Sequence, residues 1–403
     1  MKVSGSTAEQ GRIYNERIIL QLVRQNPQIS RVKLAELTGL SSQTISVITS
    51  SLLKRQLLAV TGKVKGRRGQ PSIKLSINAQ GAYSLGINID RGHISAALLD
   101  FTGHCVLLRE KLVSFPTEKV AKNIAQELLS EVKQTLGEDW CKVQGIGLTR
   151  PGFMDAWLET LVTDAEQRNQ LNDLKLELSY WQSDAFELWL EKTSGVACYC
   201  ENDATAAATS EVLLSADTFK KHLFYIFVST ACGGSFVADG ECYIGAHGQA
   251  GRFGMIATAT GKHGKWTLEA LSLSSLRRYF ESHQTHWPRQ ESDWDGVKLQ
   301  SLIKQWSQEV IAEITPALLA VLALYDPADI ILAGRLPTQV NRSLIDEMQT
   351  LFKEQTLLVA PEITAAQTGY SAGVMGAAIL PLYEMFSPQR DLLLLSSKPS
   401  LAE

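Results

Sequence analysis

The sequence predicts an α/β protein in two parts, a small head over residues 1–80 and a larger two-lobed body. Three observations support this prediction. Apolar residues at helical spacing give way to alternating strands and helices near residue 80, the basic residues gather before the same point, and two strand–turn–strand units follow in the body. A chain of 403 residues also exceeds what one compact core normally holds. We expect lobe 1 over residues 81–200, lobe 2 over residues 201–388 with a C-terminal helix returning toward lobe 1, and a tail over residues 389–403.

Charge divides the chain at the same boundary. The whole chain has a net charge of −3, whereas residues 1–80 hold thirteen Lys or Arg and three acids, a balance of +10 that leaves −13 for the rest. After Glu36 no acidic residue occurs until Asp90. A basic head on an acidic body is typical of proteins that bind nucleic acid. A solvated basic tail is the alternative, but the head also carries the apolar pattern of a folded core.

The head opens with two predicted helices. Apolar residues at helical spacing indicate the first over residues 12–25. Asn26-Pro27 ends this helix, because the residue before a proline avoids the helical region. Ser30 is a good N-cap for a second, short helix over residues 31–38.

The third helix of the head is expected over residues 42–55, with Gly39 in the preceding turn and Ser41 as its N-cap. A short helix, a tight turn and a longer helix form a helix-turn-helix, which places the start of its second helix against base edges in the major groove. Small hydrogen-bonding side chains suit this contact, although a solvated helix start would also be polar. The candidate DNA-contacting residues on the helices are Arg31, Ser41, Ser42, Gln43, Thr44 and Ser46.

A cationic hairpin completes the head. Residues 57–64 and 72–78 are predicted to form two short strands, and residues 65–71 form the tip between them. Arg67 and Arg68 in this tip could reach phosphates or enter a narrow minor groove. The head is therefore predicted to be a winged helix-turn-helix that binds double-stranded DNA.

The body contains two similar strand–turn–strand units. The first comprises strands over residues 83–90 and 94–101. The second comprises strands over residues 223–229 and 235–238, with a turn over residues 231–234. Such a repeat predicts a duplicated α/β body with a cleft between its lobes.

Composition indicates a cytoplasmic protein without membrane association. The N-terminus lacks the pattern of a signal peptide, and we expect no run of about 18 apolar residues. The six cysteines are scattered and are expected to be reduced, without metal-finger spacing.

Short sequence motifs of several kinds are distributed along nearly the whole chain. In the head they are Ser30-Arg31, Leu34-Ala35, Thr38-Gly39-Leu40-Ser41 and Gly66-Arg67-Arg68-Gly69-Gln70-Pro71. In the body they are Gly145-Ile146-Gly147-Leu148-Thr149-Arg150-Pro151-Gly152, Glu201-Asn202-Asp203-Ala204, Gly240…Gly245…Ala250-Gly251, Leu332-Ala333-Gly334 and Gly376-Ala377-Ala378. With these motifs the chain resembles the ROK family of repressors, open reading frames and kinases. The resemblance implies an actin-like ATPase fold, oligomerisation through the body, and often a sugar or sugar phosphate as effector.

The resemblance also implies which residues a ROK sugar kinase needs for catalysis. The two phosphate-binding loops of this chain differ from the family pattern at several of these positions. The family's catalytic base is the Asp of an Asn-Asp pair, here Asn202-Asp203, although Asp203 could equally be a structural helix cap. The metal-holding acid of the first hairpin is replaced by Asn88, and glycines beside it by Asp90 and Arg91. An amide lacks the anionic oxygen that Mg²⁺ prefers. The second loop, residues 229–235, has lost three of the four glycines in the family pattern G-T-G-x-G-x-G.

The family's sugar clamp and zinc segment also differ. The clamp Glu is Arg252 here, and the His is Met255. The zinc segment corresponds to residues 260–269 and contains no cysteine, so we expect no zinc, no other metal and no cofactor. Glu269 matches the family's last Glu and is expected to face the ligand.

These departures predict a regulator whose body senses a ligand and has no catalytic residues. Arg252 in place of an acid favours an anionic effector, such as a sugar phosphate or sugar acid, over a neutral sugar. The alternative is that Arg252 pairs with Glu269 or Asp203 and fills a pocket that binds nothing. The candidate effector-binding residues are Asn202, Asp203, Arg252, Glu269 and Arg150.

Three functions remain open from the sequence. The first is a regulator, expected to be a repressor of carbohydrate-related genes, that binds a palindromic operator as a homodimer or homotetramer. The second is an active ATP-dependent sugar kinase with a DNA-binding head. The third is a regulator controlled by a protein partner.

Overall fold

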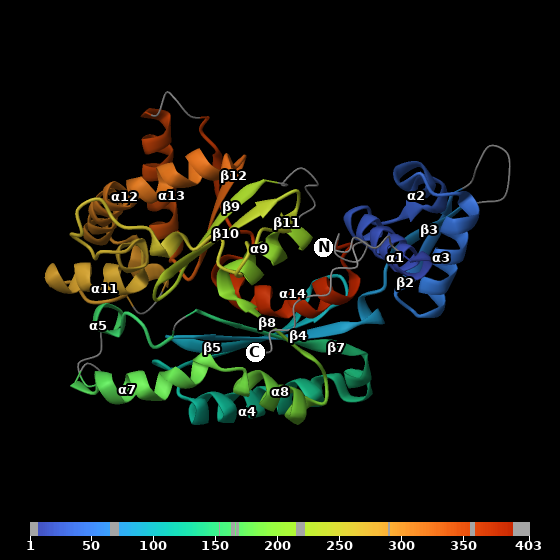
Figure 1. Cartoon of the computed structure of the whole chain (residues 1–403), viewed down its shortest axis with the longest axis horizontal. Coiled ribbons are helices and arrows are strands. Elements are labelled where there is room, and N and C mark those ends of the chain that lie inside the picture. Colours follow the sequence, from blue (N-terminus) through green and yellow to red (C-terminus); the bar gives the residue numbers. More distant parts are fainter. Residues whose placement is uncertain are drawn as a thin grey trace.

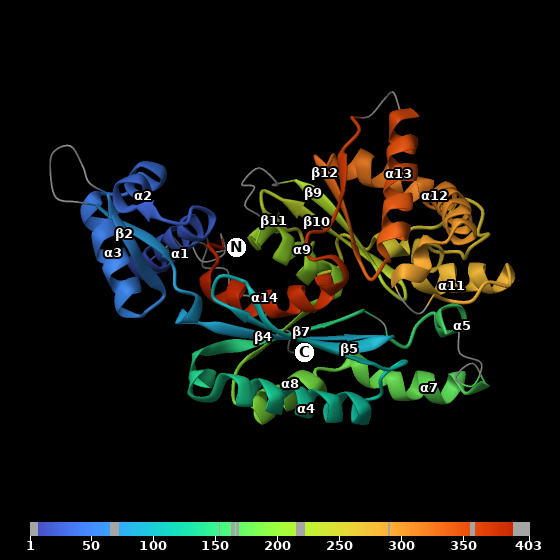
Figure 2. The same cartoon turned by 180° about the vertical axis from the view of Figure 1, so that it is seen from behind.

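A computed structural model describes residues 7–64, 72–152, 154–162, 166, 169–214, 222–288, 291–354 and 359–389. The head lies at one end of the molecule, beside two lobes that stack on each other (Figures 1 and 2). The architecture is the winged helix-turn-helix and two-lobed α/β body expected from the sequence. The wing-tip residues Arg67 and Arg68, and the tail from residue 390 onward, lie outside the described residues.

The head contains three helices and a small sheet. Thr7 caps the first helix four residues earlier than predicted, because its hydroxyl accepts from the Gln10 amide at 3.2 Å while the Gln10 side chain accepts from the Thr7 amide at 2.7 Å. Gly39 closes the second helix in the left-handed region (φ 69°). The strand order is β1-β3-β2. The elements are α1 (Ala8–Gln25), β1 (Ile29–Ser30), α2 (Arg31–Thr38), α3 (Ser42–Lys54), β2 (Leu58–Val64) and β3 (Ser72–Ile77).

Lobe 1 is built on a five-stranded sheet of order β6-β5-β4-β7-β8. Helices α4 and α8 cover one face of this sheet, and α14 lies on the other (Figure 1). The strands are β4 (Tyr83–Asp90), β5 (His93–Asp100), β6 (Cys105–Leu112), β7 (Val143–Arg150) and β8 (Cys198–Asn202). The helices are α4 (Glu118–Leu136), α5 (Leu158–Leu161), α7 (Leu171–Leu178), α8 (Ala185–Ser194), and α14 (Ala372–Phe386) from the chain end.

Lobe 2 repeats the same topology. Its five-stranded sheet has the order β11-β10-β9-β12-β13, which matches lobe 1 strand for strand in sequence order. The strands are β9 (Leu223–Val228), β10 (Cys232–Ala238), β11 (Glu241–Cys242), β12 (Asp329–Gly334) and β13 (Glu362–Ala365). The helices are α9 (Asp203–Leu214), α10 (Thr267–Ala270), α11 (Leu273–Ser282), α12 (Val297–Tyr325) and α13 (Thr338–Glu354).

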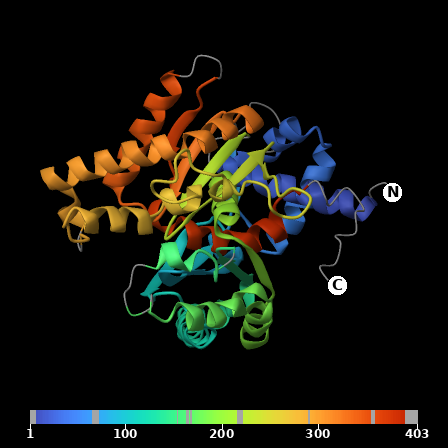
Figure 3. The ribbon, with the colours of Figure 1, turned by 60° about the vertical axis from the view of Figure 1, so that its left-hand side comes forward.

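Helix α14 lies between the lobes and reaches the head (Figures 1 and 3). It approaches the backbone of lobe 1 closely, because a Cβ on Gly147 would collide with the carbonyl of Ala377. The far end of α14 shares one hydrophobic core with the head, including Ile19, Phe101 and Phe386. The head is therefore packed onto the body and is more than a tethered module.

One expectation from the sequence is wrong. Residues 232–234, predicted as a turn, belong to β10 and pair with β9 in register from Cys232 opposite Val228. Helix α12 is long and apolar enough to cross a membrane by length and composition alone, since an 18-residue window has a mean hydropathy of 1.5, although Glu309 and Glu313 interrupt its apolar residues. Half of that window is buried inside the protein, as in the core helices of folded domains.

Candidate functional site: a recognition helix and an interlobe cleft

The exposed side of α3 is the candidate DNA-contacting surface. Ile45, Ile48 and Leu52 are buried against the head core, so the opposite side of the helix faces outward. Ser42 and Gln43 are exposed at the N-terminal end, as expected for base contact. This arrangement leaves the start of α3 open to a major groove.

The side chains of other predicted DNA-contacting residues make hydrogen bonds within the head or are partly buried. The Ser41 hydroxyl accepts from the Thr44 amide at 3.1 Å and lies 2.8 Å from the Thr44 hydroxyl, so these two side chains cap the helix. Ser46 is half-buried. The Arg31 guanidinium donates to the Ser50 hydroxyl at 3.2 Å across the helix-turn-helix. Gln43 and Ser42 are therefore the most available of the predicted residues.

A cavity of about 110 Å³ lies at the ends of β4, β8 and β9, between the lobes. It brings together Asn202, Asp203 and Arg252 of the predicted effector-binding set. This volume is well below the ~300 Å³ of pockets that hold drug-sized ligands, so the cavity suits only a small ligand. Its charged or aromatic lining residues are Asp90, Arg91, Trp157, Asp203, Phe227 and Arg252.

Two predicted effector-binding residues lie elsewhere. Arg150, expected beside Arg252, does not line the cavity, because its guanidinium pairs with Glu187 on α8 at 2.6 Å. Glu269 is also absent from the lining. Its carboxylate accepts from the Thr160 hydroxyl at 2.6 Å and from the Trp266 amide at 3.0 Å. The structure thus groups three of the five candidates.

The two hairpins that match the family's phosphate loops are tied together by side chains. Asp90 is the last residue of β4, and its carboxylate accepts a hydrogen bond from the hydroxyl of Ser229, which directly follows β9. The same carboxylate accepts from the Arg91 amide at 2.6 Å. Asn88 is buried and donates to the Thr149 hydroxyl at 3.0 Å, so its amide serves packing within lobe 1. Side-chain hydrogen bonds of Asp90 thus link the two hairpins beside the cavity.

Asp203 is the buried acid of the cavity. It begins α9, and its carboxylate and the Asn202 side chain both accept from the Ala204 amide, at 2.9 and 3.1 Å. Burial, and then the charge of Asp90, raise the pKa of Asp203 to about 7, against the opposing effects of the Ala204 hydrogen bond and Arg91. Both interpretations of Asp203 stay open, since its carboxylate accepts from an amide in the first turn of α9 and the residue also lines the cavity.

A second link joins the lobes at the cleft edge, which the sequence did not indicate. Arg335, just after β12, donates to both carboxylate oxygens of Glu110 on β6 at 2.6 and 3.1 Å. The guanidinium also lies 3.8 Å from the ring centroid of Tyr370. A bidentate pair of this kind fixes the spacing of the two lobes.

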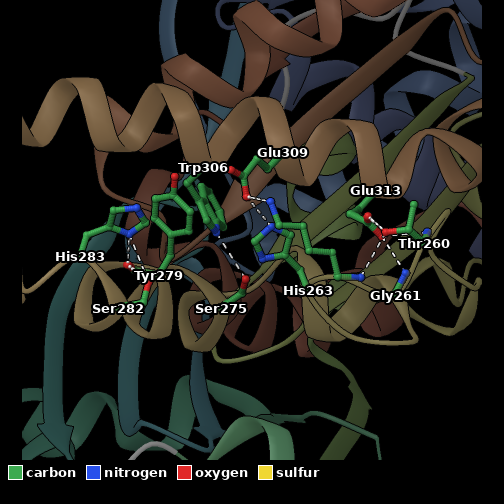
Figure 4. A network of polar contacts seen from close by, with 11 residues as sticks. Thr260, Gly261, His263, Ser275, Tyr279, Ser282, His283, Trp306, Glu309 and Glu313 are labelled. Atoms are coloured by element: carbon green, nitrogen blue, oxygen red, sulfur yellow. Dashed lines mark hydrogen bonds and ion pairs between the residues drawn. The ribbon is translucent and has the colours of Figure 1, made fainter.

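The segment that matches the family's zinc site does not fit a zinc ion. Residues 257–270 contain no cysteine, and the described part of the chain holds no cluster of three or more potential metal ligands. Carboxylates of α12 hold the loop instead (Figure 4). Glu313 accepts from the Thr260 and Gly261 amides at 3.1 and 3.0 Å. Glu309 contacts Lys262 at 2.8 Å and His263 at 2.9 Å.

Comparison with known proteins agrees with both halves of the fold. A model described as ROK family matches residues 84–383, and one described as winged helix-turn-helix DNA-binding matches residues 14–58. The chain is 26% identical to the uncharacterized protein y4fQ of Sinorhizobium fredii over 92% of this chain and 91% of that protein. It is 24% identical to the xylose repressor of Bacillus spizizenii, covering 65% of this chain and 67% of the relative. A solved ROK family transcriptional regulator, a homologue of the E. coli MLC protein, superposes with a TM-score of 0.67 at 20% identity, covering 94% and 98% of the two chains.

Proposed function

The chain belongs to the ROK family and is a DNA-binding regulator, and we propose that it represses carbohydrate-related genes through a body that senses a ligand without phosphoryl transfer. The open start of α3 on a basic head carries this proposal, because the head shares one core with a body that contains a small cleft between its lobes. The name of the xylose repressor to which the chain is similar supports a carbohydrate-related role.

The geometry of this kind of head supports a symmetric assembly. A helix-turn-helix regulator reads a two-fold operator as a symmetric oligomer, so a homodimer or homotetramer on a palindromic site is the expected form. The cytoplasm is the expected compartment of such a regulator.

The effector proposed for the cleft is a small sugar-derived anion. Arg252 and Arg91 line the cavity together with Asp90 and Asp203, and the pKa of Asp203, raised to about 7 by burial and by Asp90, reduces the negative charge of that acid near neutral pH. Guanidinium groups bind carboxylates and phosphates strongly. A sugar phosphate or sugar acid is therefore favoured over a neutral sugar, and no cofactor is required.

The central experiment selects DNA from genomic fragments with the full chain, then asks which metabolites release it. A defined palindromic site, and release by a sugar phosphate or sugar acid, are the expected results. Binding that ignores sequence at moderate salt would contradict the proposal. Thermal shift by neutral sugars alone would refute the anionic effector while leaving the regulator intact.

An active sugar kinase is the second candidate, because Asn202 and Asp203 are retained at the cavity and a carboxylate with a pKa near 7 suits a general base. Consumption of ATP over a sugar panel decides between the two. The side-chain link from Asp90 to Ser229 predicts no consumption above background. Turnover that disappears in Asp203→Asn would establish the kinase.

A further inference from the structure

Val47 is an apolar residue on the open side of the recognition helix. Its side chain is 65% exposed, whereas its neighbour Ile48 is 6% exposed within the head core. Gln43 precedes Val47 by one helical turn and Ser50 follows by one, and both are exposed. Val47 thus stands in the middle of a polar stripe that points away from the protein.

Neither packing nor helix propensity explains a valine at this position. An exposed side chain stabilises the head little by burial. A β-branched residue is also a poorer helix former than Ala, Lys or Gln. The exposed Val47 side chain is therefore available to a partner that docks on the start of α3.

The charge of the head identifies double-stranded DNA as that partner. Within the head's described residues, Glu16 pairs with Arg55, and Glu36 pairs with Lys33 at 3.0 Å. The remaining basic excess favours a phosphate backbone over an acid-poor or apolar protein surface. On the DNA major groove, the C5-methyl of thymine is the apolar group that a base pair presents.

We propose that Val47 is a specificity-determining residue that contacts the methyl of a thymine close to an adenine read by Gln43. A glutamine suits bidentate bonding to adenine N6 and N7. Val47 lies four residues along α3, about 6 Å at 1.5 Å per residue. Since base pairs are spaced by about 3.4 Å, the thymine belongs to a base pair one or two steps from that adenine.

The test removes the methyl group from the DNA and the side chain from the protein. A duplex is selected from a randomised library with the full chain, and each thymine is replaced singly by uracil, which lacks only the methyl. We expect one thymine in each half-site where uracil weakens wild-type binding about fourfold at fixed salt. Val47→Ala should weaken binding to the thymine duplex by a similar factor and should not distinguish thymine from uracil there.

A matched control is Val297→Ala, since Val297 is a valine 88% exposed on α12 of the body. This variant should keep the full uracil effect. Equal uracil effects in wild type and Val47→Ala, or no sensitive thymine in a duplex that wild type binds, would overturn the assignment of Val47. This inference rests on the proposed function. A wild-type chain that selects no duplex would overturn both the DNA-binding regulator and the role of Val47, whereas the outcomes above overturn the role of Val47 alone.

Discussion

At the scale of single residues, Asp203 shows how burial sets the chemistry of the cleft. It is 7% exposed, and the neighbouring Asp90 opposes its ionisation. A carboxyl group whose folded pKa is near 7, against an ordinary value of 3.8, keeps its proton in the folded chain while the unfolded chain releases it. Folding stability therefore falls as pH rises between these two values and is flat above the higher one.

Asp203→Asn should remove this pH dependence. The amide oxygen can still accept from the Ala204 amide but carries no charge, so the variant avoids the cost of ionising a buried acid. We expect wild type and variant to be similar near pH 4. Above pH 4, the free energy of unfolding of the variant should rise relative to that of wild type by about 1.4 kcal/mol for each pH unit, up to about pH 7. Urea unfolding across pH 4–8 measures the difference.

Asp326→Asn is the matched control for this prediction. Asp326 is exposed in the left-handed region (φ 43°) at the end of α12, where Asn is equally well tolerated. The stability gain of Asp203→Asn at pH 7 should exceed that of Asp326→Asn, because only Asp203 is a buried acid. A constant gap between wild type and Asp203→Asn across the range would show that Asp203 ionises normally.

At the scale of elements, α12 holds the loop over residues 257–266 with carboxylates. Burial raises the pKa of Glu313, but hydrogen bonds from Thr260 and Gly261 outweigh it and leave the pKa lowered. Glu309 contacts Lys262 and His263 nearer the surface. The loop leads into α10, which lies against the cavity lining at Leu268. We therefore expect Glu313 to stabilise the conformation of the loop that precedes α10 beside the cavity.

Glu313→Gln should destabilise the protein by about 1–2 kcal/mol, because the hydrogen bonds from the Thr260 and Gly261 amides then end on a neutral amide oxygen in place of a charged carboxylate. Glu309→Gln is the milder comparison and should cost at most about 1 kcal/mol, as for exposed ion pairs. Urea unfolding measures both. A metal chelator should leave the wild-type midpoint unchanged. A chelator effect as large as that of Glu313→Gln would show that a metal holds the loop.

Local sequence signals predicted the head better than they predicted the cleft. Ser30, Ser41 and Gly39 act within a few residues, so α2 and α3 were predicted to within one residue. Arg150 was misplaced because its partner Glu187 comes from a helix 37 residues further along the chain. The exposure of a side chain depends on the folded structure of the head. The sequence alone therefore did not identify Val47 as an exposed residue on α3.

At the scale of the whole molecule, α14 links the cavity to the head. Gly376 of α14 packs closely against α9, because a Cβ at this position would come within 2.5 Å of the Ala207 amide nitrogen. Helix α9 begins at Asp203, which lines the cavity. At its other end, the Ser387 carbonyl accepts from the Arg17 guanidinium of α1 at 3.0 Å. A shift of α9 on ligand binding would therefore be transmitted to the head through packed helices.

Phe386 at the end of α14 should control how firmly the head is held. Its ring meets Phe101 edge-on at 4.7 Å, and Arg24 of α1 lies over Phe101 at 5.3 Å. Burial lowers the pKa of Arg24 to about 10, so this junction is well desolvated. Phe386→Ala opens a cavity in the core that head and body share.

We expect amide hydrogen exchange of α1 in Phe386→Ala to accelerate at least about tenfold, or ~1.4 kcal/mol, because local opening of the head becomes easier. Strands β9 and β12 of lobe 2 lie outside this core and should keep their wild-type exchange. Met385→Ala removes a side chain that is 41% exposed on the same helix and should leave α1 unchanged. Unchanged exchange of α1 in Phe386→Ala would mean that the head is held by the linker after β3 and not by α14, and transmission from the cavity would then need another route.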